Sequence, residues 1–547
     1  MRVMRWLSVV ALALAALPAS AGETILLHGG TITTDAGGAT VEALVADDGR
    51  ITFVGALAEA KKRAPAARGI DLKGAFAYPG FVDGHAHLSG IGLQELTLDL
   101  TGIASLKKMQ EALGAYAAAH KEGPITGRGW IETHWPEKRF PTRADLDAVV
   151  ADRPVFLERI DGHAAVANSK ALALGGITKR TASPAGGRIE RDAMGEATGM
   201  LIDAAMDLVA DELPEPTPAM RREAMARAVA RQAAMGWTGV HNMSTSADDV
   251  ALLSALAAEK NLPIRVDAYM TPEDSARVLT SGPYQDATGL VRVRGVKLYA
   301  DGALGSRGAA LLKPYSDAKT NGLVLMGPAK LAPFYKRAKK AGAQVTVHAI
   351  GDRANRLVLD SYAKTFGKQG GRDLRWRIEH AQVIAPADIP RFAKLGVIAS
   401  MQPSHAVSDL YFAPARLGPE RLKGAYAWAS LLKTGAAIVG GSDAPVERGV
   451  ALEEFYAAVH RHDLKGNAGK DWHLDEAVSR PQALAMFTSA PAHAVFREGD
   501  LGKLAVGMRA DVSVFSVDLL KAAPAEVPAG RPLKTIVNGA VVYSAGP

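Results

Sequence analysis

The sequence predicts an α/β protein: a (β/α)₈ barrel of the TIM type, a small β-sandwich domain built from both termini, and an insertion that caps the barrel mouth. Three patterns predict this architecture. Short apolar strands alternate with Ala-rich helical stretches through most of the chain, β-type runs occur near both ends, and the region from Gly123 to about Glu212 lacks the alternation. The 547 residues suffice for two to four domains or one large barrel with attachments.

Residues 1–21 have the three parts of a secretory signal peptide. Two arginines precede an apolar run of 12 residues (6–17), and the small-residue sequence Ala-Ser-Ala (19–21) precedes Gly22. The apolar run is shorter than the roughly 20 residues that a membrane-spanning helix needs. We therefore expect cleavage after Ala21, export to the periplasm or the extracellular space, and no stable membrane anchor.

Composition excludes several classes of function. The net charge of +7 falls to +5 when the two leader arginines are removed, and no basic arm or stripe stands out, so nucleic acid is not an expected partner. The chain has no cysteine, which excludes disulfides, thiolate zinc sites, iron–sulfur clusters and a cysteine nucleophile. Any metal must bind His, Asp, Glu or a lysine-derived ligand.

Two separated segments predict the β domain. Residues 24–72 contain short β-type runs broken by Gly and Asp, and the same sequence pattern occurs again in 502–518 and 535–546. Each segment is too small to form a core alone, so we expect both to build one domain. The expected domains are a signal peptide (1–21), the two halves of the β domain (22–76 and 495–547), and a barrel (77–494) with an insertion at about 123–212.

The barrel region contains nine candidate strands, one more than the fold needs. They are FAYPGFVD (76–83), RPVFLER (153–159), GWTGVHN (236–242), PIRVDAYM (263–270), RGVKLYAD (294–301), AQVTVHAI (343–350), RWRIEHA (375–381), GVIASMQ (396–402) and AAIVGGSD (436–443).

Several metal-binding residue types stand where these strands end. His85 and His87 follow the first strand, and residues two apart in extended chain point the same way, so both imidazoles can reach one metal. His348, His380 and Asp443 each end a separate strand. Singly, each is more often a hydrogen-bonded core residue or a helix cap. Together, at the barrel end where active sites lie, they predict a metal site.

Lys297 lies within an apolar strand, between Val296 and Leu298. A lysine that points into a barrel core is costly unless it is paired or neutral. Desolvation lowers the pKa of an amine, and a neutral amine can add carbon dioxide to form a carbamate, a two-oxygen anionic ligand. The residues alone leave this open against an ion pair with a carboxylate such as Asp301.

The chain resembles the metal-dependent amidohydrolase superfamily from about Glu23 to its C-terminus. The motifs that carry this resemblance are AYPGFVDGHAHLSG, KLYADGALGSRGA, VHAIGDRAN, RIEHAQVI, GGSDAPV and the closing GMRADVSVFS. Four further segments are similar to the amidohydrolase-3 branch, which includes N-substituted formamide deformylases: GRGWIETHWPE, PTRADLD, RPVFLERIDGHAAVANSKAL and GGRIERD.

The resemblance implies a binuclear metal site and a substrate-facing histidine. It implies six metal ligands: His85, His87, Lys297 as carbamate, His348, His380 and Asp443. It also implies that His163, in the DGHAAVANS segment, faces the substrate. Imidazole and carboxylate ligands suit two Zn²⁺ ions, although Mn²⁺, Fe²⁺ or Co²⁺ would also be accepted.

The ligand types predict hydrolysis of a C–N amide-type bond, and the resemblance implies a small-molecule N-acyl or N-formyl amine as the substrate. Metal-bound water, whose pKa falls toward ~7, would attack as hydroxide. Asp443 would act as the general base and pass the proton to the leaving amine. His163 or Arg307 could stabilise the oxyanion.

Other functions stay open at this point. The same residues could hydrolyse cyclic amides, lactones, dipeptides or phosphotriesters, because the metal pair determines the nucleophile and does not determine the substrate. A non-catalytic periplasmic binding protein is disfavoured, because it has no need of six polar groups at one barrel end. A structural metal site is usually four-coordinate and local in sequence. The sequence leaves open whether the chain forms a homodimer.

Overall fold

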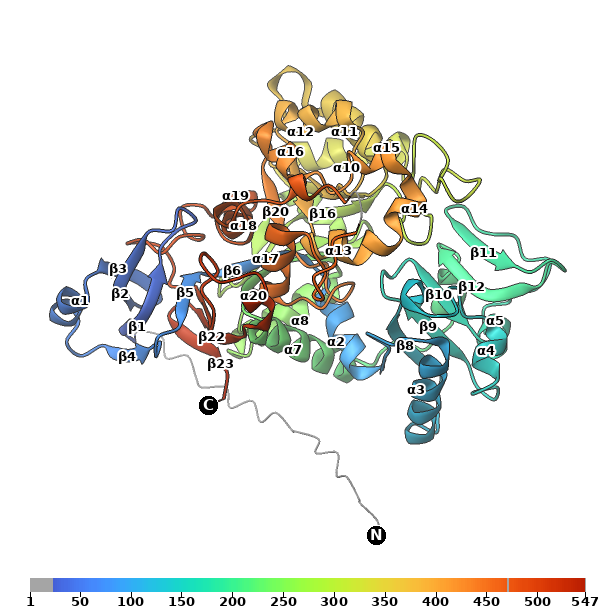
Figure 1. Ribbon diagram of the computed structural model, residues 1–547, viewed down its shortest axis with the longest axis horizontal. Coiled ribbons are helices and arrows are strands. Elements are labelled where there is room, and N and C mark those ends of the chain that lie inside the picture. Colours follow the sequence, from blue (N-terminus) through green and yellow to red (C-terminus); the bar gives the residue numbers. More distant parts are fainter. Residues whose placement is uncertain (1–22, 470–471, 547) are drawn as a thin grey trace, which may run out of the picture.

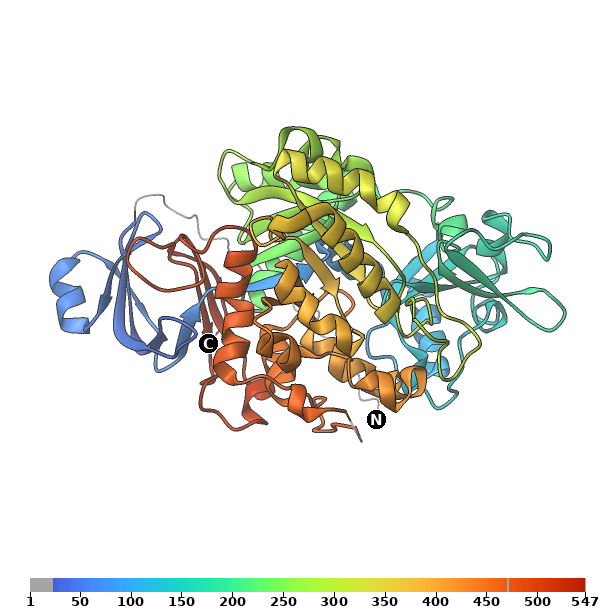
Figure 2. The same cartoon turned by 90° about the horizontal axis from the view of Figure 1, so that it is seen from above.

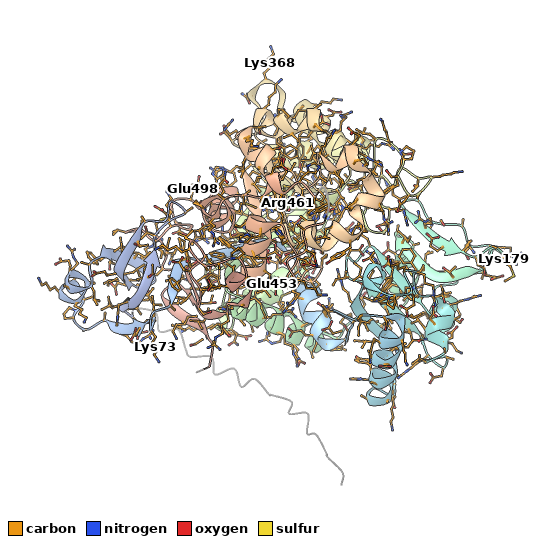
Figure 3. The ribbon with its side chains drawn as sticks, viewed as in Figure 1. Lys73, Lys179, Lys368, Glu453, Arg461 and Glu498 are labelled. Atoms are coloured by element: carbon orange, nitrogen blue, oxygen red, sulfur yellow. The ribbon has the colours of Figure 1, made fainter. Side chains whose placement is uncertain are left out.

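A computed structural model describes residues 23–469 and 472–546, so the expected signal peptide lies outside the described residues. Within these ranges the strands form three sheets, which follow one another along the longest axis of the molecule (Figures 1 and 2). The central sheet is the barrel. Lys73, beside the sheet of the two termini, and Lys179, beside the third sheet, lie at opposite ends of the molecule (Figure 3).

Eight parallel strands form a nearly closed barrel, in the order β20-β19-β18-β17-β16-β14-β13-β6. They are β6 (Phe81–Ala86), β13 (Trp237–Thr245), β14 (Arg265–Met270), β16 (Val291–Tyr299), β17 (Gln344–Ala349), β18 (Arg377–His380), β19 (Ile398–Met401) and β20 (Ile438–Gly440). The short strand β15 (Tyr284–Gln285) pairs antiparallel with β16. The first and last strands meet through a parallel bridge between Ala86 and Ala444. The predicted barrel is confirmed as this nearly closed sheet.

Closure of the barrel depends on a glycine in the first strand. A Cβ atom at Gly84 would lie 2.3 Å from Cγ1 of Val439 and 2.4 Å from the carbonyl oxygen of Gly440. No side chain fits at such a distance, so only glycine lets β6 approach β20 this closely.

Eight of the nine candidate strands are the barrel strands, and the ninth, 153–159, lies in the expected insertion at about 123–212. That segment contains β9 (Val155–Arg159), which belongs to the third sheet. A short apolar run is typical of any buried strand, so its pattern cannot show which sheet it joins.

Helices follow most barrel strands and lie against the outside of the barrel (Figure 2). They are α2 (Leu88–Leu96), α7 (Pro218–Ala234), α8 (Ala247–Ala258), α9 (Val278–Ser281), α10 (Pro328–Ala341), α11 (Asp352–Phe366), α12 (Ile389–Leu395), α13 (Pro403–Ser408), α14 (Ala413–Leu417), α15 (Pro419–Leu422), α16 (Trp428–Lys433), α17 (Ala451–His460), α18 (Arg480–Phe487) and α19 (Ser489–Ala494). Polar residues begin several of them; Ser246, for example, accepts a hydrogen bond from the backbone of Asp249 in a capping box that starts α8. No helix in the described ranges combines the length and apolar character needed to cross a bilayer.

Strands from both ends of the chain form one eight-stranded sheet, in the order β23-β22-β21-β5-β1-β2-β3, with β4 beside β1. The elements are β1 (Ile25–Thr33), β2 (Thr40–Asp47), β3 (Arg50–Gly55), α1 (Leu57–Arg63), β4 (Arg68–Asp71), β5 (Phe76–Pro79), β21 (Val512–Phe515), α20 (Glu526–Ala529), β22 (Pro532–Val537) and β23 (Ala540–Ser544). The two halves join where β5 pairs antiparallel with β21. The arrangement of this sheet as a sandwich stays a prediction.

The third sheet has six strands, in the order β11-β12-β10-β9-β8-β7. Besides β9, this unit contains β7 (Leu98–Asp99), α3 (Leu106–Ala119), β8 (Ile125–Trp130), α4 (Arg143–Asp147), β10 (Ala164–Ala167), α5 (Ser169–Leu174), β11 (Gly187–Arg191), β12 (Ala197–Asp203) and α6 (Asp207–Ala210). Met109 and Leu113 of α3 share a buried cluster with Trp130 and Met200. We therefore place the start of this inserted unit near Leu98 rather than near Gly123, because α3 packs into its core and not onto the barrel.

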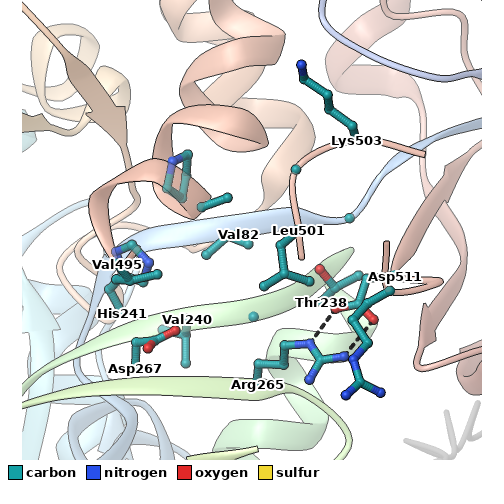
Figure 4. A pocket seen from close by; sticks show the side chains of 16 residues that line it. Val82, Thr238, Val240, His241, Arg265, Asp267, Val495, Leu501, Lys503 and Asp511 are labelled. Atoms are coloured by element: carbon teal, nitrogen blue, oxygen red, sulfur yellow. Dashed lines mark hydrogen bonds and ion pairs between the residues drawn. The ribbon is translucent and has the colours of Figure 1, made fainter. Parts of the chain in front are cut away.

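A small cavity lies between the terminal sheet and the N-terminal ends of the barrel strands (Figure 4). Nε of Arg265 lies 2.5 Å from Oδ2 of Asp511 beside it, which joins the barrel to the terminal sheet. The volume of about 20 Å³ has room for roughly one water molecule. The cavity therefore does not compete with the opposite barrel end as a site for a substrate.

Candidate metal centre

The structure brings all six predicted ligand residues to the C-terminal end of the barrel. They are His85 in β6, His87 just after it, Lys297 in β16, His348 in β17, His380 in β18 and Asp443 after β20. Neighbouring rings follow one another closely: the centroids of His85 and His380 are 4.8 Å apart, and those of His380 and His348 are 4.6 Å apart. Parallel strands place these residues together because their C-terminal ends meet at one rim.

Asp443 lies at the centre of this cluster. Its Oδ1 lies 3.3 Å from Nε2 of His85 and 3.2 Å from Nε2 of His87. This oxygen is buried and has no hydrogen-bond partner among the described residues. One carboxylate oxygen and two imidazole nitrogens therefore point at the same place, and no hydrogen bond joins them. Divalent cations bind such sets of donor atoms. The residues present therefore fit the implied metal.

Electrostatics favour the protonation states that metal ligands need. Burial lowers the pKa values of His348 and His380 well below the ordinary value, so both rings are neutral. Burial alone would raise the pKa of Asp443, but His85 and the other histidines hold it well below its usual range. Neutral imidazole and ionised carboxylate are the forms that bind metal.

A buried carboxylate orients His85. Nδ1 of His85 lies 2.5 Å from Oε2 of Glu379. The same carboxylate accepts hydrogen bonds from Arg377, at 2.8 Å to Oε1 and 3.0 Å to Oε2, and from Thr346 to Oε1. An acceptor on Nδ1 places the ring proton there, so the lone pair of Nε2 points toward Asp443. The sequence analysis missed Glu379; a charged residue inside the apolar strand RWRIEH was the available signal.

Acceptors also orient the next two histidines. Nδ1 of His380 lies 2.9 Å from Oε1 of Gln402, and Nε2 of His348 lies 3.4 Å from the carbonyl oxygen of Gly302. Each ring therefore keeps its other nitrogen free for a ligand bond. His380 and Asp443 also have left-handed backbone conformations, with φ of 71° and 59°. Non-glycine residues adopt these rarely, and such conformations cluster at functional sites.

Lys297 is buried beside His85, and among the described residues it has no ion-pair partner. Its Nζ lies 3.3 Å from Nε2 of His85, and no carboxylate within the described ranges lies within 4.0 Å of it. Asp301, the alternative partner, instead accepts backbone hydrogen bonds from Ala310, Ile350 and Gly351. Burial lowers the pKa of Lys297 to about 8. The amine is therefore neutral in about a tenth of the molecules at pH 7 and in about half of them at pH 8.

His163 reaches the cluster from the inserted unit, whereas Arg307 does not. The ring centroid of His163 lies 5.2 Å from that of His348, and its Nδ1 lies 2.7 Å from Oδ1 of Asp203. Burial alone would lower the pKa of His163, but hydrogen bonding to Asp203 raises it. The guanidinium of Arg307 forms hydrogen bonds of 3.2 and 2.9 Å with Asp317. The sequence spacing places Arg307 in the long loop after β16. It does not show in which direction the side chain of Arg307 points.

His405 is a further histidine of the cluster that sequence reasoning missed. Its Nε2 lies 3.6 Å from Oδ2 of Asp443, and its ring stacks on His380 with centroids 5.8 Å apart. Burial lowers the pKa of His405 to about 4. It lies in α13, three residues beyond the last residue of the candidate strand 396–402. A histidine inside a helix does not occupy a strand end, so the strand pattern alone does not mark it as a site residue.

Glu379 offers a first test of the metal centre. We expect Glu379→Gln to weaken metal binding by ~10–100-fold, because His85 loses its charged acceptor. Competition with a chelating dye measures the change. Glu476→Gln, which replaces a buried carboxylate bonded to Ser430, is the control and should leave metal affinity unchanged. Equal affinities of the Glu379→Gln and wild-type proteins would contradict this role.

Known proteins that are similar to this chain include hydrolases. The family model described as "Amidohydrolase family" matches residues 68–543. The protein YtcJ of Bacillus subtilis is 35% identical over 531 residues, which cover 94% of this chain and 98% of YtcJ. The N-substituted formamide deformylase of Arthrobacter pascens is 29% identical over 539 residues, 95% of this chain and 98% of that enzyme. An uncharacterized metal-dependent hydrolase from Pyrococcus furiosus superimposes with a TM-score of 0.72 at 31% identity, covering 91% of this chain and 100% of that one.

Proposed function

Because the chain belongs to the amidohydrolase family, we propose that it is a metal-dependent hydrolase that cleaves the C–N bond of an N-acyl or N-formyl amine. The observation that carries this proposal is that the Nε2 atoms of His85 and His87 converge on Oδ1 of Asp443, which has no hydrogen-bond partner among the described residues. The likeness to a formamide deformylase supports an amide-type substrate. A binding protein would gain nothing from burying these groups together.

We propose that His85, His87, Lys297, His348, His380 and Asp443 hold two divalent cations, with Zn²⁺ suited to the donor set. When bound, such cations lower the pKa of water and polarise a carbonyl group. Lys297 would contribute as a carbamate: its neutral Nζ forms a bond to the carbon of CO₂ and loses one proton, leaving an anion with two oxygens. The position of Nζ, buried 3.3 Å from Nε2 of His85 and without a carboxylate partner in the described residues, supports this modification.

Asp443 is proposed to move the proton of the reaction. Oδ1 faces His85 and His87, whereas Oδ2 faces His380 and His405 at 3.9 and 3.6 Å. Oδ2 would accept a proton from the attacking water and pass it to the nitrogen of the leaving amine. The low pKa of Asp443 keeps its carboxylate in the unprotonated form that a general base requires.

The inserted unit is proposed to cover the substrate. His163, 5.2 Å from His348 between ring centroids, comes from the segment between β9 and β10 of this unit. The hydrogen bond to Asp203 fixes its ring. A cover of this kind excludes water and shapes the pocket, which decides between substrates that share one metal pair.

Export is also proposed, with the mature chain beginning at Gly22. The small-residue sequence before Gly22 and the short apolar run support cleavage there. The intact mass of the protein isolated from the periplasm or medium measures this. Retention of residues 1–21 by the exported protein would contradict it.

A hydrolysis screen tests the proposed activity. Metal-reconstituted protein is assayed against N-formyl amines, N-acyl amino acids, dipeptides, hydantoins and lactones, with release of amine or acid as the readout. We expect turnover of N-formyl or N-acyl amines. Turnover confined to lactones, or no turnover by protein that carries its metal, would contradict the proposal.

A further inference from the structure

We propose that His405 is a further catalytic residue, whose Nε2–H group donates a hydrogen bond to the carbonyl oxygen of the substrate, and that Gln382 is the positioning residue that fixes this proton. The inference rests on the proposed hydrolase function and deepens it. Of the two predicted oxyanion donors, His163 reaches the cluster whereas Arg307 is bonded to Asp317, so a second donor has to come from another group at the barrel end.

Nε2 of His405 is a buried polar atom with no hydrogen-bond partner among the described residues. The nearest oxygens are Oδ2 of Asp443 at 3.6 Å and Oε1 of Glu447 at 4.0 Å, both beyond hydrogen-bond distance. Oε1 of Glu447 already accepts a hydrogen bond of 2.6 Å from Ser408. An unpaired donor in a buried site beside the proton carrier Asp443 is therefore available to a bound oxygen.

The partner of the other ring nitrogen separates His405 from the ligand histidines. Nδ1 of His405 lies 2.8 Å from Nε2 of Gln382, an amide nitrogen that can only donate. Oε1 of Gln382 has no hydrogen-bond partner among the described residues, so the polarity follows from this contact alone: with the amide nitrogen against Nδ1, the ring proton is on Nε2. His85 and His380 show the opposite polarity, because Glu379 and the amide oxygen of Gln402 face their Nδ1 atoms. Gln402 is held in this orientation because its Nε2 donates to the carbonyl oxygen of Ser400 at 3.4 Å.

This polarity suits amide hydrolysis. Negative charge grows on the carbonyl oxygen as the tetrahedral intermediate forms, and a fixed N–H donor stabilises it more than it stabilises the ground state. The ring of His405 is held by stacking on His380 and by Gln382, so little reorientation is needed. Its loss should therefore lower kcat while KM changes little.

The test compares variants of the metal-loaded full chain. Metal content is measured, and kcat and KM are measured on the N-acyl or N-formyl amine that wild type turns over best. His405→Phe should keep about the wild-type number of metals, lower kcat by ~10²–10³-fold and leave KM within a few-fold. His405→Gln, which retains a donor, should recover part of kcat. Gln382→Met should lower kcat by a smaller factor, and the double variant should be no slower than His405→Phe, because Gln382 acts only through His405.

Gln402→Met is the matched control, because Gln402 faces a proposed metal ligand. It should lose metal, whereas Gln382→Met should not. Loss of metal from His405→Phe or Gln382→Met would show that His405 is a ligand and overturn the inference, as would an unchanged kcat or additive losses in the double variant. Wild-type protein that carries metal but hydrolyses no amide would overturn the proposed function and this inference together.

Discussion

Lys297→Arg should give a folded chain that has lost its metal and its turnover. Arginine stays protonated and cannot add CO₂, so the proposed bridging anion cannot form. A fixed positive charge would stand instead where Nζ lies 3.3 Å from Nε2 of His85. Because Lys297 would be a ligand itself, we expect metal affinity to fall by more than ~100-fold, the upper range for loss of a residue that only supports a ligand. Metal analysis and turnover measure both effects.

Lys297→Ala separates the carbamate from a purely structural lysine. It should also lose metal and activity, and added small carboxylic acids should restore part of both by occupying the position of the carbamate oxygens. A structural lysine would instead cost stability and leave metal content unchanged. A folded Lys297→Arg protein with near-native turnover and two metals per chain would remove the carbamate from the mechanism.

Asp443→Asn should lower turnover by ~10²–10⁴-fold or more, the range for loss of a general acid–base group. The amide oxygen carries no charge and does not accept the proton that the leaving amine requires. Metal content should fall as well, because Oδ1 of Asp443 lies 3.2–3.3 Å from Nε2 of both His85 and His87. Asp388→Asn, which replaces a buried carboxylate paired with Arg356 and Arg391, is the control for folding and should keep both metal and turnover. Full activity of Asp443→Asn would contradict the proposed role.

The barrel and its site were predictable because their signals are local. Strand patterns of four to eight residues indicated all eight barrel strands, and His85, His87, His348, His380 and Asp443 could be placed together because parallel strands end at one rim. Lys297 was conspicuous because a lysine inside an apolar strand has to be neutral or paired.

Other parts of the structure depend on contacts that spacing does not show. Strand 153–159 lies within the predicted insertion at about 123–212, but its pattern does not show that it pairs with β8 and β10. Arg307 lies in a loop, where no periodicity fixes the direction of a side chain. His405 and Glu379 join the site through tertiary packing of a helix start and of a strand interior.

Metal content per chain is the measurement that tests the account most directly. Elemental analysis of protein grown in metal-replete medium should find close to two divalent metals per chain, and prolonged chelation should remove them together with all hydrolytic activity. Re-addition of Zn²⁺ should restore both, because imidazole nitrogens and a carboxylate are donors that suit this cation. Near-zero metal in a protein that retains full activity would contradict the account.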